Sequence, residues 1–365
     1  MDMTSFVLYH TLEMQKISAP TFQEENRARY VEEQFQEAGL ANICMDSIGN
    51  VYGRIPGGSE NPVVISSHLD TVHPIQTDLT VKNLDDRIIG PGIGDNTLGV
   101  AALLGIAANF KNSGINLAGD LWLVADVCEE GLGNLRGARA MVERFGSHPL
   151  AYIILEGIGL GRIFNRGLGV ARYRISIRTP GGHAWSNYGS PSAIHEIAYL
   201  ITQLEKIPIP ENPRTSWNVG VITGGISVNS IASEASLELD LRSEASENLD
   251  RLKKRVLEIC GETGRRKNDV RVSHELIGVR PAGGISDDHP LVVLTREMLE
   301  KHGVASQTGI ASTDANVPLS MGYPAVCIGL TRGGNSHTTQ EFILKESLST
   351  GLAFLMDFIP RIWGM

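Results

Sequence analysis

The chain has 365 residues, of which 32 are basic and 41 are acidic, so its formal net charge is −9. This length predicts more than one compact unit, because single hydrophobic cores stop growing beyond about 250–300 residues. The negative charge argues against nucleic acid or an anionic membrane as the main partner. No apolar stretch approaches the ~20 residues of a membrane span, and from the first residues we expect no secretion signal. Four scattered cysteines without a CxxC pair fit a cytoplasmic protein, which we expect this chain to be.

The first part of the chain alternates helical and strand-like segments. Residues 24–38 predict an amphipathic helix, and Asn96 or Thr97 is expected to cap a buried helix that reaches Phe110. Apolar runs typical of strands lie at 51–55, 63–67, 121–124 and 152–155. This order of strand, helix and strand predicts an α/β fold with a mainly parallel sheet.

The pattern changes after residue 165. Residues 170–177 alternate polar and apolar side chains, as in a strand with one wet face. A helix is expected from Ser190 to Lys206 with Pro191 at its first position, and another, capped by Ser246, to Cys260. Strands at 219–223 and 237–241 complete a small α+β domain of ferredoxin-like order.

From Gly283 the first pattern resumes, with helices at 290–302 and 345–359 and a strand at 325–328. We therefore predict a large α/β domain made of residues 1–165 and 283–365. The smaller domain, residues 166–282, is inserted into it.

Acidic and histidine side chains follow several predicted strands. Open α/β sheets bind ligands beyond the carboxyl ends of their strands, so these side chains can converge in space. Two like charges ~4 Å apart repel by about 4 kcal/mol at an effective dielectric constant of ~20, and several such pairs would exhaust a stability of ~5–15 kcal/mol. If they converge, either cations neutralise them or some of the acids are protonated, and two divalent ions would suffice. The seven residues concerned are His68, Asp70, Asp95, Glu129, Glu130, Glu156 and His337.

Each of these motifs alone has a simpler interpretation. On a strand, His68 and Asp70 share one face, and Asp70 can accept from the ring nitrogen that does not bind metal. Asp95 precedes a predicted helix and could merely cap it, but Asn96 could do that instead and leave Asp95 to bridge two ions. Adjacent acids such as Glu129 and Glu130 are often a solvated turn; in a strand-end loop, one can bind metal while the other serves as base.

Together the motifs resemble those of the co-catalytic zinc hydrolases that include acetylornithine deacetylase, succinyl-diaminopimelate desuccinylase, aminoacylase, glutamate carboxypeptidase and peptidase T. The resemblance covers nearly the whole chain. It rests on Ser67-His68-Leu69-Asp70, Gly94-Asp95-Asn96, Glu129-Glu130-Gly131, Glu156, Gly181-Gly182-His183, Gly224-Gly225 with Asn229, Asp240-Leu241-Arg242, Ser312-Thr313-Asp314-Ala315 and His337.

The resemblance implies two divalent metal ions, zinc in the first place, with cobalt or manganese as alternatives. One ion would be bound by His68, Asp95 and Glu156, and the other by Asp95, Glu130 and His337. In this family the bridging aspartate often precedes a cis peptide bond, so one is expected between Asp95 and Asn96.

The resemblance also implies roles for other residues. Glu129 would be the general base for a bridging water, and Asp70 would orient the metal-binding histidine. The inserted domain would be a lid and dimerisation domain, giving a homodimer. In this inserted domain, His183 would stabilise the oxyanion, and Asn229 and Arg242 would hold the substrate. An alternative for Arg242 is an exposed salt bridge on a strand.

Hydrolysis of an amide bond in a small peptide or an N-acyl amino acid is therefore the expected activity. The run from Asp95 to Gly99 departs from the Asp-Met-Lys-Gly of the desuccinylase and deacetylase branch, and Ser312 stands where many relatives have glycine. These departures favour a peptidase, with a deacylase similar to acetylornithine deacetylase as the alternative. A non-catalytic binding module and a single structural zinc site are the remaining hypotheses; the second lacks the cysteines such sites prefer.

Overall fold

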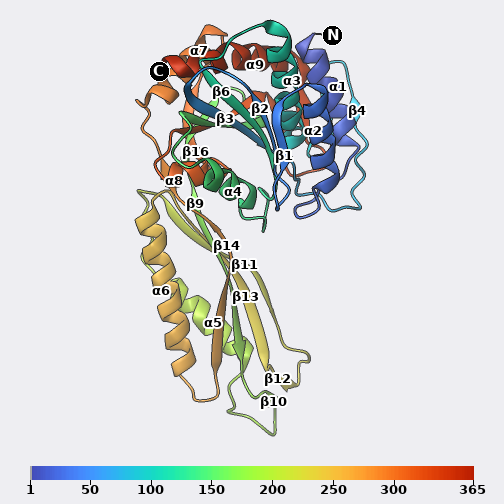
Figure 1. The fold of residues 1–365 in the computed structure, drawn as a ribbon. Coiled ribbons are helices and arrows are strands. Elements are labelled where there is room, and N and C mark those ends of the chain that lie inside the picture. The colour runs from blue at the N-terminus through green and yellow to red at the C-terminus, as the bar shows by residue number, and fades with distance from the viewer. Residues whose placement is uncertain (1) are drawn as a thin grey trace. The chain divides into compact units, whose positions relative to one another are not determined.

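The computed structural model describes residues 2–365, without the side chains of residues 112 and 113. The chain divides into two compact units (Figure 1). The first unit contains the residues up to Gly167 together with Gly284–Met365, and the second unit is Leu168–Gly283. Each unit has its own buried hydrophobic core, so the two are described separately.

A nine-stranded sheet forms the centre of the first unit. Its four middle strands are parallel and are, in spatial order, β6 (Gly119–Asp126), β3 (Glu60–His68), β7 (Ala151–Ile158) and β17 (Ala325–Thr331). The flanking strands are β1 (Ala41–Met45), β2 (Val51–Ile55), β8 (Arg162–Gly167), β15 (Gly283–Gly284) and β16 (Gln307–Ala311). The predicted α/β fold with a mainly parallel sheet is confirmed.

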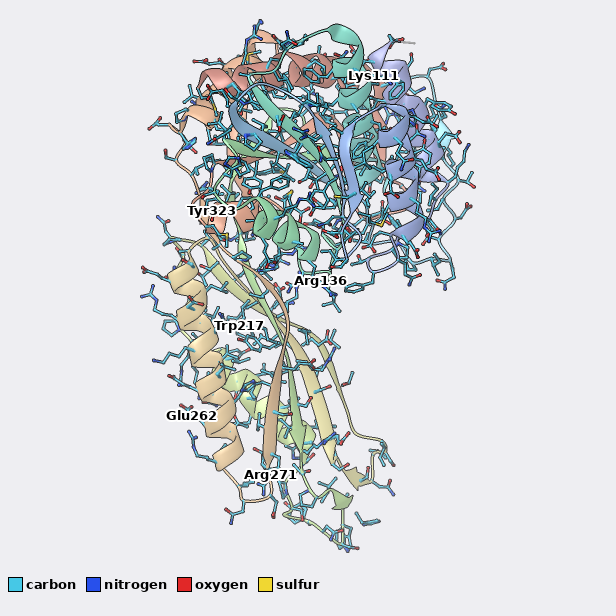
Figure 2. The ribbon with its side chains drawn as sticks, viewed as in Figure 1. Lys111, Arg136, Trp217, Glu262, Arg271 and Tyr323 are labelled. Atoms are coloured by element: carbon cyan, nitrogen blue, oxygen red, sulfur yellow. The ribbon has the colours of Figure 1, made fainter. Side chains whose placement is uncertain are left out.

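Successive residues of the middle strands point into cores on opposite faces of this sheet. Val63 and Ile65 of β3 belong to one core, whereas Val64 belongs to the other. Side chains fill the layers between the sheet and the helices (Figure 2). The helices of the first core are α1 (Met3–Gln15), α2 (Glu25–Glu37), α3 (Leu98–Ser113), α7 (Pro290–Lys301) and α9 (Lys345–Phe358), and those of the second are α4 (Arg136–Phe145) and α8 (Asn316–Ser320). Burial on both faces explains why these strands are continuous apolar runs in the sequence.

The segment before α3 agrees with one of the two predicted caps. Thr97 occupies the N-cap position of α3, but its side chain makes no capping hydrogen bond, and its hydroxyl donates to the Gly92 carbonyl at 2.7 Å. Asn96 does not cap the helix, because strand β7 offers it both partners: its side chain donates to the Leu155 carbonyl at 2.8 Å and accepts from the Gly157 amide at 2.9 Å. The predicted cis peptide bond between Asp95 and Asn96 is present.

By length and composition, the helical segment Ile93–Lys111 could cross a membrane, which was not expected from the sequence. However, 83% of its most apolar window is buried inside the protein. A helix in the core of a folded unit passes the same test, and α3 is such a helix.

A small second sheet joins two distant parts of the first unit. Its strands, in spatial order, are β18 (Gly333–Gly334), β19 (Phe342–Leu344), β5 (Arg87–Ile89) and β4 (Lys82–Asn83). Because β19 pairs with β5, the loop before β19 lies beside the segment that follows β5. That loop carries His337, and that segment carries Asp95.

In the second unit, four antiparallel strands are covered on one face by two helices. The strands are β11 (Thr215–Gly224), β13 (Glu234–Ser243), β9 (Gly169–Arg178) and β14 (Arg271–Arg280), and the helices are α5 (Ala193–Leu204) and α6 (Ser246–Arg265). A short pair, β10 (Gly182–His183) with β12 (Ser230–Ile231), lies outside this sheet. The β-α-β-β-α-β order along the chain is that of ferredoxin-like folds.

Both predicted helix starts in the second unit are wrong. Helix α5 begins at Ala193, two residues after Pro191, with extended Ser192 as its N-cap. Ser246 is itself the first residue of α6, and Ala245 is the N-cap, so no side chain caps that helix. In each case, an extended residue directly before the helix sets where it begins.

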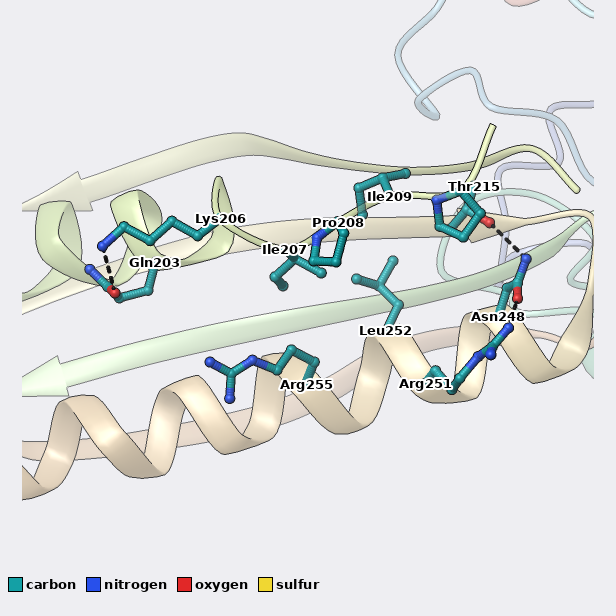
Figure 3. A pocket seen from close by; sticks show the side chains of 11 residues that line it. Gln203, Lys206, Ile207, Pro208, Ile209, Thr215, Asn248, Arg251, Leu252 and Arg255 are labelled. Atoms are coloured by element: carbon teal, nitrogen blue, oxygen red, sulfur yellow. Dashed lines mark hydrogen bonds between the residues drawn. The ribbon is translucent and has the colours of Figure 1, made fainter. Parts of the chain in front are cut away.

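A cavity of about 610 Å³ lies between α6 and the chain segment that follows α5 (Figure 3). Its apolar lining includes Ile207, Pro208 and Leu252, and the side chains of Arg251 and Arg255 also line it. All of its lining residues belong to the second unit.

Candidate metal centre

His68 lies at the carboxyl end of β3 and is 1% exposed. Its Nε2 atom is 3.2 Å from Oδ1 of Asp95 and 3.7 Å from Oε2 of Glu156. Glu156 comes from β7, which is the neighbour of β3 in the sheet. Adjacent parallel strands therefore bring these side chains together, as expected for the carboxyl end of an α/β sheet.

His337 lies on the other side of Asp95. Its Nε2 atom is 3.1 Å from Oδ2 of Asp95 and 3.2 Å from Oε1 of Glu130. The two oxygens of one carboxylate thus face two different imidazole rings. Such an arrangement suits a carboxylate that bridges two cations.

Among the described residues, three groups of side chains could hold a metal ion. Two ligand atoms, each about 2.1 Å from one tetrahedral ion, lie about 3.4 Å apart. The separations of 3.1–3.7 Å around Asp95 therefore fit ions at both positions. The groups are His68, Asp95 and Glu156; Asp95, Glu130 and His337; and His68, Glu129 and Glu130.

Asp70 is fully buried and lies beside His68, the residue that it was predicted to orient. The Nδ1 atom of His68 lies 3.0 Å from the main-chain oxygen of Asp70 and 3.5 Å from its carboxylate. The carboxylate also accepts from the backbone amides of Glu129 and Glu130, both at 2.9 Å, and from the Thr21 hydroxyl at 2.8 Å. Asp70 thus holds the loop that carries both glutamates, and its carbonyl sets the ring of His68.

Glu341 was not predicted as part of the site. Its buried carboxylate accepts from the amides of Gly94 at 2.6 Å and Asp95 at 2.8 Å, and from the His337 amide at 3.3 Å. It therefore ties the loop of Asp95 to the loop of His337. Burial, together with the charge of Asp95, raises the pKa of Glu341 to about 7.

The electrostatics of the centre favour protonated histidines in the metal-free protein. Burial lowers the pKa of His68, but the carboxylates of Asp70, Asp95 and Glu156 together raise it well above its ordinary value. Hydrogen bonds to Asp95 and Glu130 raise the pKa of His337 to about 10. Protons therefore occupy the place of cations when no metal is bound.

Two further buried acids, Asp126 and Asp314, were also not predicted as part of the site. Asp126 ends β6 opposite His68 in the sheet, and both acids are fully buried. Burial raises the pKa of Asp126 to about 7, and burial next to Asp126 and Glu129 raises that of Asp314 well above its ordinary value. Neither acid belongs to the three candidate ligand groups, whose donor atoms lie within 4.8 Å of one another.

The three remaining predicted site residues belong to the second unit. His183 is exposed on β10, and its Nδ1 atom accepts from the amides of Trp185 at 3.2 Å and Ser186 at 3.4 Å. Asn229 is linked to the same loop, because its main-chain carbonyl accepts from the Ala184 amide at 2.9 Å.

Arg242 lies on β13 of this unit, and its Nε donates to Asp240 at 2.7 Å. It thus forms the salt bridge on a strand that was its alternative interpretation. Asp240 also accepts from Arg172 at 2.9 Å, so one carboxylate serves two arginines.

Residues 64–361 match the sequence profile of Peptidase family M20/M25/M40. The chain belongs to this family. Carboxypeptidase G2 of Pseudomonas sp. (strain RS-16) is 24% identical over 306 residues, which are 80% of this chain and 72% of that protein. Crystal structures of a tripeptidase from Staphylococcus aureus subsp. aureus Mu50 and of aminopeptidase PepT from Bacillus cereus ATCC 10987 share its fold. Their TM-scores are 0.84 and 0.82 at 22% and 21% identity, and each comparison covers 99% of both chains.

Membership of this peptidase family confirms the predicted resemblance and the predicted class of enzyme, a metal-dependent peptide hydrolase. The candidate ligand groups around Asp95 belong to such an enzyme.

Proposed function

We propose that this member of Peptidase family M20/M25/M40 hydrolyses short peptides in the cytoplasm with two zinc ions. The observation that carries the proposal is that two three-residue groups share the carboxylate of Asp95. Their donor atoms are imidazole nitrogens and carboxylate oxygens, which suit zinc, with cobalt and manganese as alternatives. All four cysteines are free, in keeping with a reducing compartment.

His68, Asp95 and Glu156 would hold one ion, and Asp95, Glu130 and His337 the other. When bound, the ions would polarise the scissile carbonyl and make a water molecule more acidic. Glu129 lies among the ligand atoms, since one of its oxygens is within 4.8 Å of ligand atoms of His68 and Glu130. In this proposal, Glu129 accepts the proton of the attacking water and delivers it to the leaving amine.

His183 would stabilise the oxyanion through its Nε2 atom. Two backbone amides donate to Nδ1, so the neutral ring carries its proton on Nε2. That N–H can donate to the oxygen on which negative charge develops. Asn229 and Arg242 would hold the substrate. The Arg242 guanidinium would pair with a carboxylate of the peptide and with Asp240 at the same time.

Metal-loaded protein is expected to release amino acids from di- and tripeptides faster than it cleaves N-acetyl or N-succinyl amino acids. Amino acid release can be followed by chromatography after loading with zinc, cobalt or manganese, and elemental analysis gives the number of ions. About two ions per chain and peptide cleavage would support the proposal. Faster cleavage of N-acyl amino acids would favour the deacylase, and metal-loaded protein inactive on every substrate would contradict both.

The second unit would also form a homodimer through strand β11. This strand is at one edge of its sheet, and its Val221 and Ile222 side chains are about half exposed. The neighbouring loops expose Trp185, Ile226 and Val228 almost completely. An apolar edge strand of this kind is normally covered by another chain, here a second copy.

Sedimentation equilibrium is expected to give the mass of two chains, and Ile222→Glu is expected to give one. Leu276 provides the matched control, because it is 48% exposed on β14 at the opposite edge of the sheet. Leu276→Glu should leave the dimer intact. A monomeric parent chain, or a dimer that survives Ile222→Glu, would contradict this interface.

A further inference from the structure

Three consecutive backbone amides hold the loop that carries the proposed base. The amides of Glu129 and Glu130 donate to the carboxylate of Asp70. The amide of Cys128 donates instead to Oε1 of Glu24, at 3.1 Å. Two buried carboxylates from different parts of the first unit therefore fix this loop.

Glu24 is 6% exposed and occupies the N-cap position of α2. Its side chain makes no capping bond to that helix. The same Oε1 atom accepts from the Phe22 amide at 3.0 Å and from the Cys128 thiol at 3.5 Å. The carboxylate is thus turned away from its own helix and toward a loop more than a hundred positions later in the chain.

The backbone of Cys128 needs such a partner. Its φ angle is +60°, in the left-handed region that non-glycine residues rarely adopt. Residues in this region persist where the surrounding structure holds them, and they are frequent at functional sites. Here the hydrogen bonds to Glu24 hold the residue directly before Glu129.

The buried charge of Asp70, the other carboxylate that holds this loop, has a nearby counterpart at the start of α2. Arg27, on the first turn of that helix, is 1% exposed and donates to the carbonyls of Ile17 at 2.9 Å and Leu69 at 2.9 Å. Its guanidinium is close enough to Asp70 for the two charges to stabilise each other. The start of α2 therefore anchors both the loop of residues 128–130 and the end of β3.

We propose that Glu24 is a positioning residue for catalysis, which holds Cys128 in its left-handed conformation and so places Glu129 for proton transfer. This inference rests on the proposed function, because it takes Glu129 as the base. It also makes a prediction that needs neither metal nor substrate. The amide oxygen of a glutamine could accept the same backbone bonds, so acceptance of hydrogen bonds, rather than negative charge, is the property that matters.

In metal-free protein, Glu24→Ala is expected to speed hydrogen exchange of residues 127–133 by at least ~10-fold, with β3 unchanged, because a buried acceptor is lost. At saturating metal, the same variant should lower kcat by about 10–100-fold and leave KM within about 2-fold, since small displacements of a catalytic group are costly. Glu24→Gln should restore both properties to within about 3-fold. Cys128→Ala, which removes only the thiol bond, should resemble the parent chain.

Controls separate this inference from a general loss of stability. Glu25→Ala changes the exposed neighbour on the same helix and should have no effect. If Glu24→Ala does not fold, Glu24→Asp withdraws the carboxylate by one methylene and should give a smaller loss of kcat with the same exchange pattern. Normal exchange and kcat in the alanine variant, or equal losses in the alanine and glutamine variants, would overturn the inference. Full activity of Glu129→Ala would instead overturn the proposed function, whatever Glu24 does.

Discussion

Replacing Glu129 by alanine is expected to lower kcat by about 10⁴-fold, the upper end of the range for general acid–base catalysis. The reason is that, in the proposed mechanism, the Glu129 carboxylate transfers a proton twice: it accepts one from the water and then delivers it to the leaving amine. The variant should keep its two metal ions, because the two groups that share Asp95 do not include Glu129. Initial rates on a peptide that the parent cleaves, together with elemental analysis after gel filtration, measure both quantities.

This experiment also tests the third group of candidate ligands, which does include Glu129. Loss of one ion in Glu129→Ala would make Glu129 a ligand and contradict its role as base. Glu129→Gln keeps the size of the side chain and should be as inactive as the alanine variant. Glu143→Ala, at an exposed position on α4, is the matched control and should be fully active.

Metal affinity is expected to rise steeply with pH, by about 100-fold per pH unit for the loss of two protons. The pKa of His337 is raised to about 10, and that of His68 is also raised well above its ordinary value. Both rings are therefore protonated in metal-free protein at neutral pH, and both must lose a proton to bind metal. The slope should persist at pH values below the two raised pKa values and flatten above them.

Titration calorimetry in buffers of different ionisation enthalpy counts the protons released, and about two per chain are expected at pH 7. His337→Asn should reduce the count by about one. The exposed His148 lies outside the ligand groups, so His148→Asn should leave the count unchanged. Binding that releases no protons would show that the histidines are already neutral in the metal-free protein.

The sequence revealed the strand-end residues because their strands are buried on both faces. An apolar run such as residues 152–155 predicts a strand, and an acid that follows the run is then expected at the carboxyl end of that strand. The ferredoxin-like order of the second unit was also readable, from alternating strands between amphipathic helices. The first residues of α5 and α6 could not be predicted from the sequence. Ser192 and Ala245 are the N-caps because their backbone is extended, and no side chain caps either helix as expected.

The supporting residues could not be found in this way. Glu341 lies in a polar loop, and nothing in its local sequence separates it from a solvated glutamate. Glu24 looks like the first residue of an amphipathic helix. Their functions arise from hydrogen bonds to backbone amides far away in the chain, and any carboxylate of suitable length could make such bonds. Only the folded arrangement shows which acids these are.

The pairing of β19 with β5 has a consequence for how the enzyme is made. One hydrogen bond of this region, from Gly94 to Glu341, spans 247 positions of the chain. On the ribosome, His337 and Glu341 emerge only after the whole of the second unit. In the proposed arrangement, the group of His68, Asp95 and Glu156 is therefore complete in the nascent chain before the group that needs His337.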